Sequence, residues 1–135
     1  MSDQDILGRL LVVDDDELVR DYLQTRLAEA GYACACAANG VEALQLLRRE
    51  TAPEVIILDL NMPGMDGFEF LRMTRTQIGH GFGVIVMTGQ RAPRLKEQAT
   101  GFGAFTVIEK PVAFEELLRL IRIQQQYQKI RARLR

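Results

Sequence analysis

Carboxylate side chains follow two aliphatic runs of the sequence. Asp14, Asp15 and Asp16 come directly after RLLVV, and Asp59 lies near the end of EVIILDL. Like charges at such close quarters repel one another unless solvent or a bound cation relieves them. Mg²⁺ prefers carboxylate and carbonyl oxygens and keeps part of its water shell. If the fold brings the two stretches together, they indicate a site for a divalent cation.

A hydroxyl and an ammonium group end two further apolar runs. Thr88 ends GVIVMT, and Lys110 ends FTVIEK. A divalent cation and Lys110 would together offset the crowded carboxylates. In such sites the cation commonly bridges carboxylates to a phosphate, and an aspartate can be the nucleophile that forms an aspartyl phosphate. Because a lysine and a hydroxyl can hold phosphoryl oxygens, these residue types indicate phosphoryl transfer.

Short aliphatic runs alternate with segments of helical periodicity. The expected strands are RLLVV, YACACA, EVIILDL, GVIVMT and FTVIEK. The expected helices run from about Val19 to Ala30 with Gly31 as a C-terminal cap, from the N-cap Asn39, from about Gly67 to Thr76, from near Pro93, and from near Ala113. This alternation predicts an α/β fold with a doubly wound, five-stranded parallel sheet and five helices. Since such sheets bind ligands at the carboxyl ends of their strands, the polar residues that end four strands are expected at one edge.

The totals fit one globular domain. The chain has 135 residues and a formal net charge of −1, so its overall field is not expected to recruit nucleic acid or a membrane. No apolar run reaches transmembrane length, and the start MSDQD does not resemble a signal peptide. Cys34 and Cys36 are interpreted as small core residues rather than a redox pair, because they lie too close along the chain for an ordinary disulfide. These observations favour the cytoplasm.

Several chemistries lack the residues that they need. Ser2 is the only serine and His80 the only histidine, which argues against a serine nucleophile and a zinc centre. The glycines around His80, which is expected in an exposed loop, precede a strand rather than open a helix. A nucleotide-binding phosphate loop is therefore not supported.

The motifs VVDDD, LDLNMPGMDG, MTG and EKP resemble, in order and spacing, those of receiver domains of two-component response regulators, of the chemotaxis-regulator type. The resemblance covers about residues 8–124. It implies a flavodoxin-like sheet with strand order 2-1-3-4-5. It also implies a phosphoacceptor signalling domain, rather than an enzyme, whose partner is a sensor histidine kinase or a phosphotransfer protein.

The resemblance assigns roles to the residues at the predicted edge. Asp59 takes the place of the phosphoacceptor, which attacks the phosphoryl group of a phosphohistidine. Asp15 and Asp59 would bind Mg²⁺ or Mn²⁺ through their side chains. Asn61 would add its backbone carbonyl, and Asp14 would act mainly through a metal-bound water. Lys110 would pair with the Asp59 carboxylate and then with the phosphoryl group.

Five further residues take roles by the same resemblance. Thr88 would move toward the phosphoryl group and couple phosphorylation to the surface of the fourth and fifth strands and helices, which would control an output domain or partner. Met62 and Pro63 would form the turn after the acceptor. Gly67 would let the backbone turn into the third helix. Asp16 would be the first-turn acid of the first helix, where negative charge suits the helix dipole.

The sequence departs from the family pattern in the fifth strand. The family usually carries Tyr or Phe three residues before the lysine, as a rotamer switch, whereas this chain has Val107. Phe105 is expected on the same face of the strand, either as a substitute aromatic surface or as packing under the fourth helix. The segment GQRAPRLKEQATGFGA, which should form that helix, has few large aliphatic residues, and this composition predicts a mobile helix.

The last helix continues beyond the length that a receiver domain needs. We expect the receiver domain over residues 1–124 and an extension of the helix over 125–135. Five apolar residues follow a heptad spacing: Leu120, Ile123, Tyr127, Ile130 and Leu134. This seam predicts a coiled-coil linker to an output domain, or a homodimer through the last helix, and a frayed tail is the alternative. The basic end KIRARLR carries no nucleic-acid recognition motif, so this domain itself is not expected to bind nucleic acid.

Three other classes of protein compete with the receiver domain. A phosphatase of the haloacid-dehalogenase type would carry a second aspartate two residues after its nucleophile, where this chain has Asn61, and would need room for a cap domain. A flavodoxin-like binder of small molecules would need a phosphate-binding loop after the first strand, where this chain has acids. A degenerate receiver that binds partners without phosphorylation would lack chemical residues that are all present here.

Overall fold

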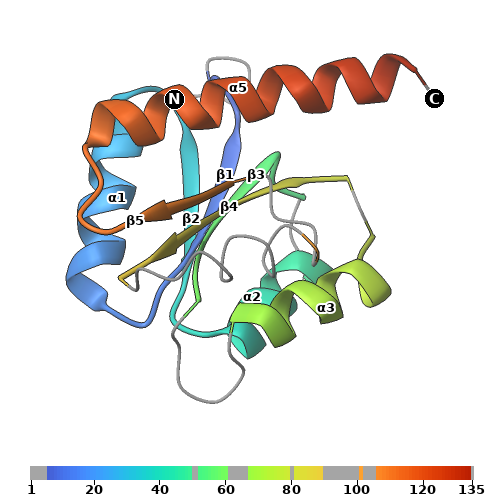
Figure 1. The fold of residues 1–135 in the computed structure, drawn as a ribbon, viewed down its shortest axis with the longest axis horizontal. Helices are drawn as coiled ribbons and strands as arrows, with labels where there is room; N and C mark the ends of the chain where they lie inside the picture. Colours follow the sequence, from blue (N-terminus) through green and yellow to red (C-terminus); the bar gives the residue numbers. More distant parts are fainter. Residues whose placement is uncertain are drawn as a thin grey trace.

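A five-stranded parallel sheet forms the centre of the molecule (Figure 1). This computed structural model describes residues 6–49, 52–60, 67–79, 81–89, 101 and 106–134. The strands are β1 (Arg9–Val13), β2 (Ala33–Ala37), β3 (Val55–Asp59), β4 (Gly83–Thr88) and β5 (Thr106–Glu109). Their order in the sheet is β2-β1-β3-β4-β5, and every neighbouring pair is parallel. The predicted fold class and strand order are confirmed.

Helices cover both faces of the sheet. The helices of the described residues are α1 (Glu17–Glu29), α2 (Gly40–Arg49), α3 (Gly67–Gln77) and α5 (Phe114–Arg133). In Figure 1, α1 and α5 lie on one face and α2 and α3 on the other. The helix expected from near Pro93 falls almost wholly outside the described residues, and so do its Leu95, Phe102 and Gly103. Gly101 alone is described there, and it is helical and exposed.

The core consists of two apolar clusters, one on each face of the sheet. On one face, Val12 and Ile57 of the strands pack with residues of α1 and α5. On the other face, Val13 and Leu58 pack with residues of α2 and α3. Because strand side chains alternate between faces, a strand that is covered on both sides must be apolar throughout. This requirement explains the continuous aliphatic runs of β1, β3 and β4.

The helix ends have the predicted caps. Gly31 follows α1 with φ of 102°, a left-handed conformation that glycine adopts without strain. The side chain of Asn39 accepts a hydrogen bond of 2.8 Å from the Glu42 amide at the start of α2. Asp16 is the N-cap of α1, one residue before the first turn in which it was expected, and accepts from the Leu18 amide at 2.9 Å. The acid of that first turn is Glu17.

Helix α5 has 20 residues, and its C-terminal part runs on beyond the sheet (Figure 1). Four of the five residues of the predicted seam are exposed: Ile123, Tyr127, Ile130 and Leu134. The fifth, Leu120, is buried against the domain. Within the described residues, no helix has the length and apolar character to cross a membrane.

Candidate functional site

The carboxyl ends of four strands bring the predicted site residues to one edge. Asp14 directly follows β1, Asp59 ends β3, Thr88 ends β4, and Lys110 directly follows β5. The strand registers align these ends, since Val13 pairs with Leu58, Asp59 with Met87, and Thr88 with Glu109. The shared edge that the alternating pattern predicts is therefore present.

Three carboxylates form an acidic cluster at this edge. Asp14, Asp15 and Asp59 each offer one oxygen, and these oxygens all lie within 4.8 Å of one another. Asp14 and Asp59 are buried, whereas Asp15 is exposed. Oxygens bound to one Mg²⁺ at about 2.1 Å lie within roughly 4.2 Å of each other, so a small contraction would fit this set to the ion. Asn61 lies outside the described residues.

Lys110 supplies the positive charge of the site. Its Nζ atom lies 3.0 Å from Asp14 Oδ2 and 3.6 Å from Asp59 Oδ2. Burial alone would lower the pKa of Lys110, but the hydrogen bonds and charges of Asp14 and Asp59 outweigh it, and the pKa is raised. The ammonium therefore stays protonated and pairs with both carboxylates, although only the pairing with Asp59 was expected.

Backbone contacts hold Asp14 in place. Its amide donates to the Ala37 carbonyl at 3.1 Å, and its carbonyl accepts from Arg20 Nη1 at 2.8 Å. Its Oδ1 atom accepts from the Asp16 amide at 2.9 Å. The sequence alone did not identify Arg20 as part of the site, and no motif in it carries a signal for this contact.

Thr88 and Lys110 are tied to each other through the backbone. The Lys110 amide donates to the Thr88 carbonyl at 2.8 Å, and the Lys110–Pro111 peptide bond is cis. The Thr88 side chain is almost fully buried at the end of β4. Val107, at the position where receiver domains usually carry an aromatic residue, packs against the cluster of the α2 and α3 face.

Gly67 lies against the residue that follows Asp59. Its amide donates to the Leu60 carbonyl at 3.0 Å, and a Cβ atom at Gly67 would lie 2.6 Å from Leu60 Cα. The φ angle of Gly67 is not positive. The glycine is therefore needed for a close backbone approach, not for the turning freedom that was expected. Met62, Pro63, His80 and Phe105 lie outside the described residues.

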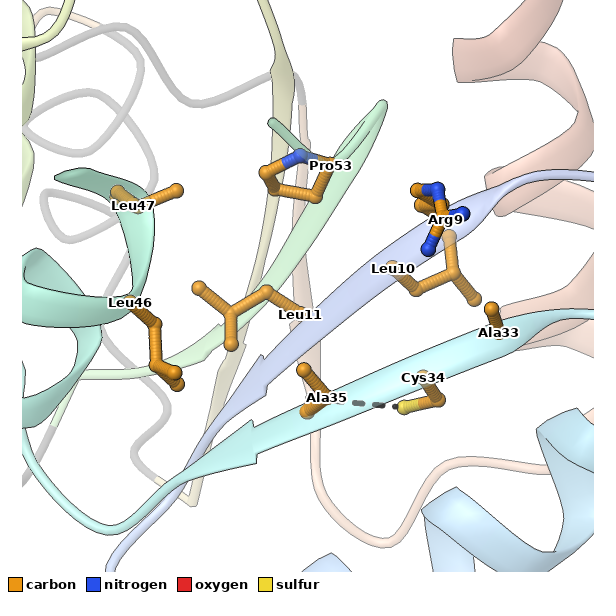
Figure 2. A pocket seen from close by; sticks show the side chains of 9 residues that line it. All are labelled: Arg9, Leu10, Leu11, Ala33, Cys34, Ala35, Leu46, Leu47 and Pro53. Atoms are coloured by element: carbon orange, nitrogen blue, oxygen red, sulfur yellow. Dashed lines mark hydrogen bonds between the residues drawn. The ribbon is translucent and has the colours of Figure 1, made fainter. Parts of the chain in front are cut away.

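The hollows beside the sheet include two that are lined by described residues. One, of about 480 Å³, adjoins the site and is lined by apolar residues of α1 and of the start of α5, together with Lys110 and Pro111. The other, of about 300 Å³, is shown in Figure 2. It lies at the opposite, amino-terminal end of β1 and β2, between these strands and α2, and its lining includes Arg9, Ala33 and Leu46. The second hollow contains none of the predicted site residues.

Known proteins resemble this chain in sequence and in fold. Residues 10–122 match the response regulator receiver domain family. The response regulator MprA of Mycobacterium leprae is 38% identical over 114 residues, which are 84% of this chain and 49% of MprA. The chain thus spans about half the length of the curated relatives that it matches.

Solved structures agree with this match. A CheY-like receiver domain from Methanospirillum hungatei JF-1 superposes with a TM-score of 0.86 at 29% identity, covering 93% of this chain and 98% of that one. For the chemotaxis protein CheY4 of Vibrio cholerae the TM-score is 0.79 at 34% identity, with coverage of 85% and 96%. The chain belongs to the response regulator receiver domain family, the signalling domain of two-component systems, in which phosphorylation on an aspartate is the general property.

Proposed function

We propose that Asp59 is the phosphoacceptor and that it receives a phosphoryl group from a histidine kinase or a phosphotransfer protein. The observation that carries this proposal is the placement of Asp59 at the end of β3, 3.6 Å from the Lys110 ammonium and beside two further carboxylates. Family membership supports an aspartate as acceptor and a histidine kinase as partner.

In the proposed reaction, an oxygen of Asp59 attacks the phosphorus of the donor phosphohistidine. The new O–P bond forms as the N–P bond breaks, and the leaving imidazole takes up a proton. Asp14, Asp15 and Asp59 would hold Mg²⁺ or Mn²⁺, with the Asn61 carbonyl as a further ligand. When bound, the ion offsets charge on the phosphoryl oxygens.

Lys110 and Thr88 would hold the phosphoryl group after transfer. The Lys110 ammonium, released from its pairing with the carboxylates, would contact one phosphoryl oxygen, and the Thr88 hydroxyl would donate to another. The same groups would let the domain promote its own phosphorylation by small phosphodonors and its own dephosphorylation. This chemistry belongs to the domain without making it an enzyme for other substrates.

The donor would dock on the apolar rim beside Lys110. Leu18 is 79% exposed and Tyr22 is 49% exposed, and both line the hollow that adjoins Lys110 and Pro111. Large apolar side chains exposed side by side indicate a protein-binding surface. A partner that covers α1 there would bring its phosphohistidine directly over the carboxyl edge of the sheet.

The last helix, α5, would transmit the effect of phosphorylation to an output domain or a partner. We propose a receiver domain over 1–124 and a helical linker over 125–135 that leads to an output domain or pairs with a second copy. The exposed seam Ile123, Tyr127 and Ile130 supports such a role, and so does the greater length of the curated relatives. Movement of Thr88 toward the phosphoryl group would alter the β4 and β5 surface. Because Val107 has no ring to swing, this surface would change without an aromatic rotamer switch.

The proposal places the domain in the cytoplasm, where it would meet the kinase. It is tested by incubating the purified chain with a small phosphodonor and Mg²⁺ and reading the intact mass. Addition of one phosphoryl group to the wild type, and none to Asp59→Asn, is expected. Equal labelling of both proteins, or no labelling of the wild type, would contradict the proposal.

A further inference from the structure

The C-terminal part of helix α5 carries an apolar seam that the domain does not cover. Four residues of the helix and its C-cap form this seam, and their exposed fractions run from 40% to 81%: Ile123, Tyr127, Ile130 and Leu134. In Figure 1, this part of the helix runs on past the sheet. Large apolar side chains exposed in a row indicate a surface that a partner covers.

The domain anchors the helix near the start of this seam. Gln125 is buried, and its side chain donates to the Leu7 carbonyl at 3.0 Å and accepts from the Tyr32 hydroxyl at 2.8 Å. Because nucleation is the costly step of helix formation, the residues that follow an anchored turn join the helix at low cost. A partner therefore meets a preformed helix and loses little conformational entropy in ordering it.

The charged residues beyond Glu116 are all basic. Glu116 is the last of the 18 acidic residues, whereas six of the 17 basic residues follow it. At about 100° per residue, Arg131 and Arg133 border the seam on its two sides, and Lys129 lies on the far side of the helix. Within the described part of the chain, no carboxylate forms an ion pair with any of these three residues. The Arg131 guanidinium lies over the Tyr127 ring, 5.9 Å from its centre, which keeps one positive charge at the edge of the seam.

We propose that the seam of α5 binds an acidic amphipathic helix of a partner, in which Glu or Asp residues border an apolar stripe, an inference that rests on the partner-binding role proposed above for α5. When two helices pair, the apolar residues of the two seams pack together, and the charged residues that border the seams select the partner. Carboxylates of the partner would meet Arg131 and Arg133, while its apolar residues would cover Tyr127 and Ile130.

A second copy of the same chain fits this surface less well. The residues that border the exposed seam are glutamine or basic, namely Gln126, Arg131 and Arg133. Two copies in contact would therefore bring positive charges together without a carboxylate on either helix to pair with them. Since like charges across such a seam are unfavourable, they select against self-pairing and in favour of an acidic helix.

The seam is also too narrow for a membrane-surface helix. Between Gln126 and Leu134, the large apolar side chains are Tyr127, Ile130 and Leu134, all of them in the seam. A helix that lies on a membrane needs a wider apolar face than such a stripe. Nucleic acid would neutralise the basic residues but would leave the apolar side chains exposed. An acidic helix complements both the charge and the apolar seam.

The test measures the binding of two synthetic helical peptides to the whole chain by fluorescence anisotropy. Each peptide has about three heptads with Leu at the a and d positions, and the e and g positions carry Glu in one peptide and Lys in the other. The acidic peptide should bind roughly tenfold more tightly, because two attractive charge pairs replace two repulsive ones. The formal net charge of the chain is −1, so attraction to the molecule as a whole does not produce this preference.

Variants of exposed residues locate the binding surface. Arg131→Glu combined with Arg133→Glu should reverse the preference, so that the basic peptide binds more tightly. Lys129→Glu is the matched control, since it makes the same change of charge on the far side of the helix, and it should keep the wild-type preference. Ile130→Gln should weaken the binding of the acidic peptide, and circular dichroism checks that this variant is folded.

Equal binding of the two peptides, or loss of the preference in Lys129→Glu alone, would overturn the inference. So would dimerisation of the chain in sedimentation at the concentrations used, or tighter binding to phosphatidylserine vesicles or a DNA duplex than to the acidic peptide. The phosphoacceptor role fails differently, because the wild type would then take up no phosphoryl group from a small phosphodonor. Asp59→Asn should still bind the acidic peptide as the wild type does, so the two failures are distinguishable.

Discussion

The Lys110 ammonium lies 3.0 Å from the fully buried carboxylate of Asp14. A buried carboxylate without a partner is strongly unfavourable. Lys110 therefore stabilises the fold of the unphosphorylated protein. The same lysine also reaches Asp59, which means that one cation serves two carboxylates.

Lys110→Met should therefore destabilise the metal-free protein. We expect a loss of about 1–3 kcal/mol in the free energy of unfolding, below the value for a fully buried pair because the lysine side chain is 31% exposed. Mg²⁺ should stabilise this variant more than the wild type, because the variant lacks the Lys110 ammonium that competes with Mg²⁺ for the carboxylates. Urea unfolding with and without Mg²⁺ measures both effects. The additional change Asp14→Asn should recover part of the loss, and a metal-free variant as stable as the wild type would show that the pair contributes nothing.

Asp15→Asn should remove the response to Mg²⁺ while leaving the metal-free fold intact. Asp15 is exposed, so its charge costs little to lose, but it supplies one of the three clustered oxygens. The measurement is the rise in thermal midpoint on adding Mg²⁺, which reports binding to the folded state. Asp16→Asn is the matched control, because asparagine caps a helix as well as aspartate and Asp16 caps α1. A wild-type response in Asp15→Asn, or its loss in the control, would argue against the assignment.

Gly83→Ala should destabilise the contact between β4 and α5. A Cβ atom at Gly83 would collide with the buried side chain of Gln124, so that side chain must move. We expect a loss of about 1–3 kcal/mol by chemical denaturation. Gly81→Ala, where a Cβ atom meets open space, should change little. Adding Gln124→Ala to Gly83→Ala should recover part of the stability, and a further loss in the double variant would refute this explanation.

Tyr32→Phe should cost stability at neutral pH and less at high pH. The Tyr32 hydroxyl donates to Gln125 Oε1 at 2.8 Å, which ties α5 to the body of the domain. Burial is the main cause that raises the pKa of Tyr32 above its ordinary value of 10.0. The neutral phenol is thus favoured in the folded state. Its contribution of about 1 kcal/mol is present below pH 10 and is lost as the pH rises through the raised pKa.

The measurement is the stability difference between Tyr32→Phe and the wild type as a function of pH. Tyr22→Phe is the control, since Tyr22 is 49% exposed and its hydroxyl accepts a hydrogen bond of 3.3 Å from Arg26, a neighbour on the same helix. A difference for Tyr32→Phe that stays constant from neutral pH to well above 10 would contradict the assignment.

The sequence predicted the sheet and the clustering of the site residues because both follow from simple regularities. Continuous aliphatic runs arise wherever a strand is covered on both faces, and polar residues at the ends of such runs must meet at one edge. The sequence therefore suffices to place Asp14, Asp59 and Lys110 at this edge. The pairing of Lys110 with Asp59 was implied by the family resemblance, but its shorter contact with Asp14 was not predicted, because that contact depends on side-chain geometry.

Sequence patterns did not predict the contacts that polar side chains make. Gln124 and Gln125 are both buried, although glutamine is ordinarily a surface residue of helices. Gln125 donates to the Leu7 carbonyl at 3.0 Å and so packs with the body of the domain, whereas the boundary expected from the usual length of a receiver domain assigns it to the extension. The hydrogen bond from Arg20 to Asp14 was not predictable from the sequence either, since it joins an ordinary helical arginine to a backbone carbonyl.

Helix α5 begins only four residues after Lys110 and continues without interruption for 20 residues. Such a helix is about 30 Å long and behaves as a stiff lever. A tilt of about 5° at its first turn would displace its far end by roughly 2.5 Å. A barely detectable adjustment around the phosphorylated carboxylate could thus become, at the other end of α5, a displacement large enough to change how a neighbouring domain is seated.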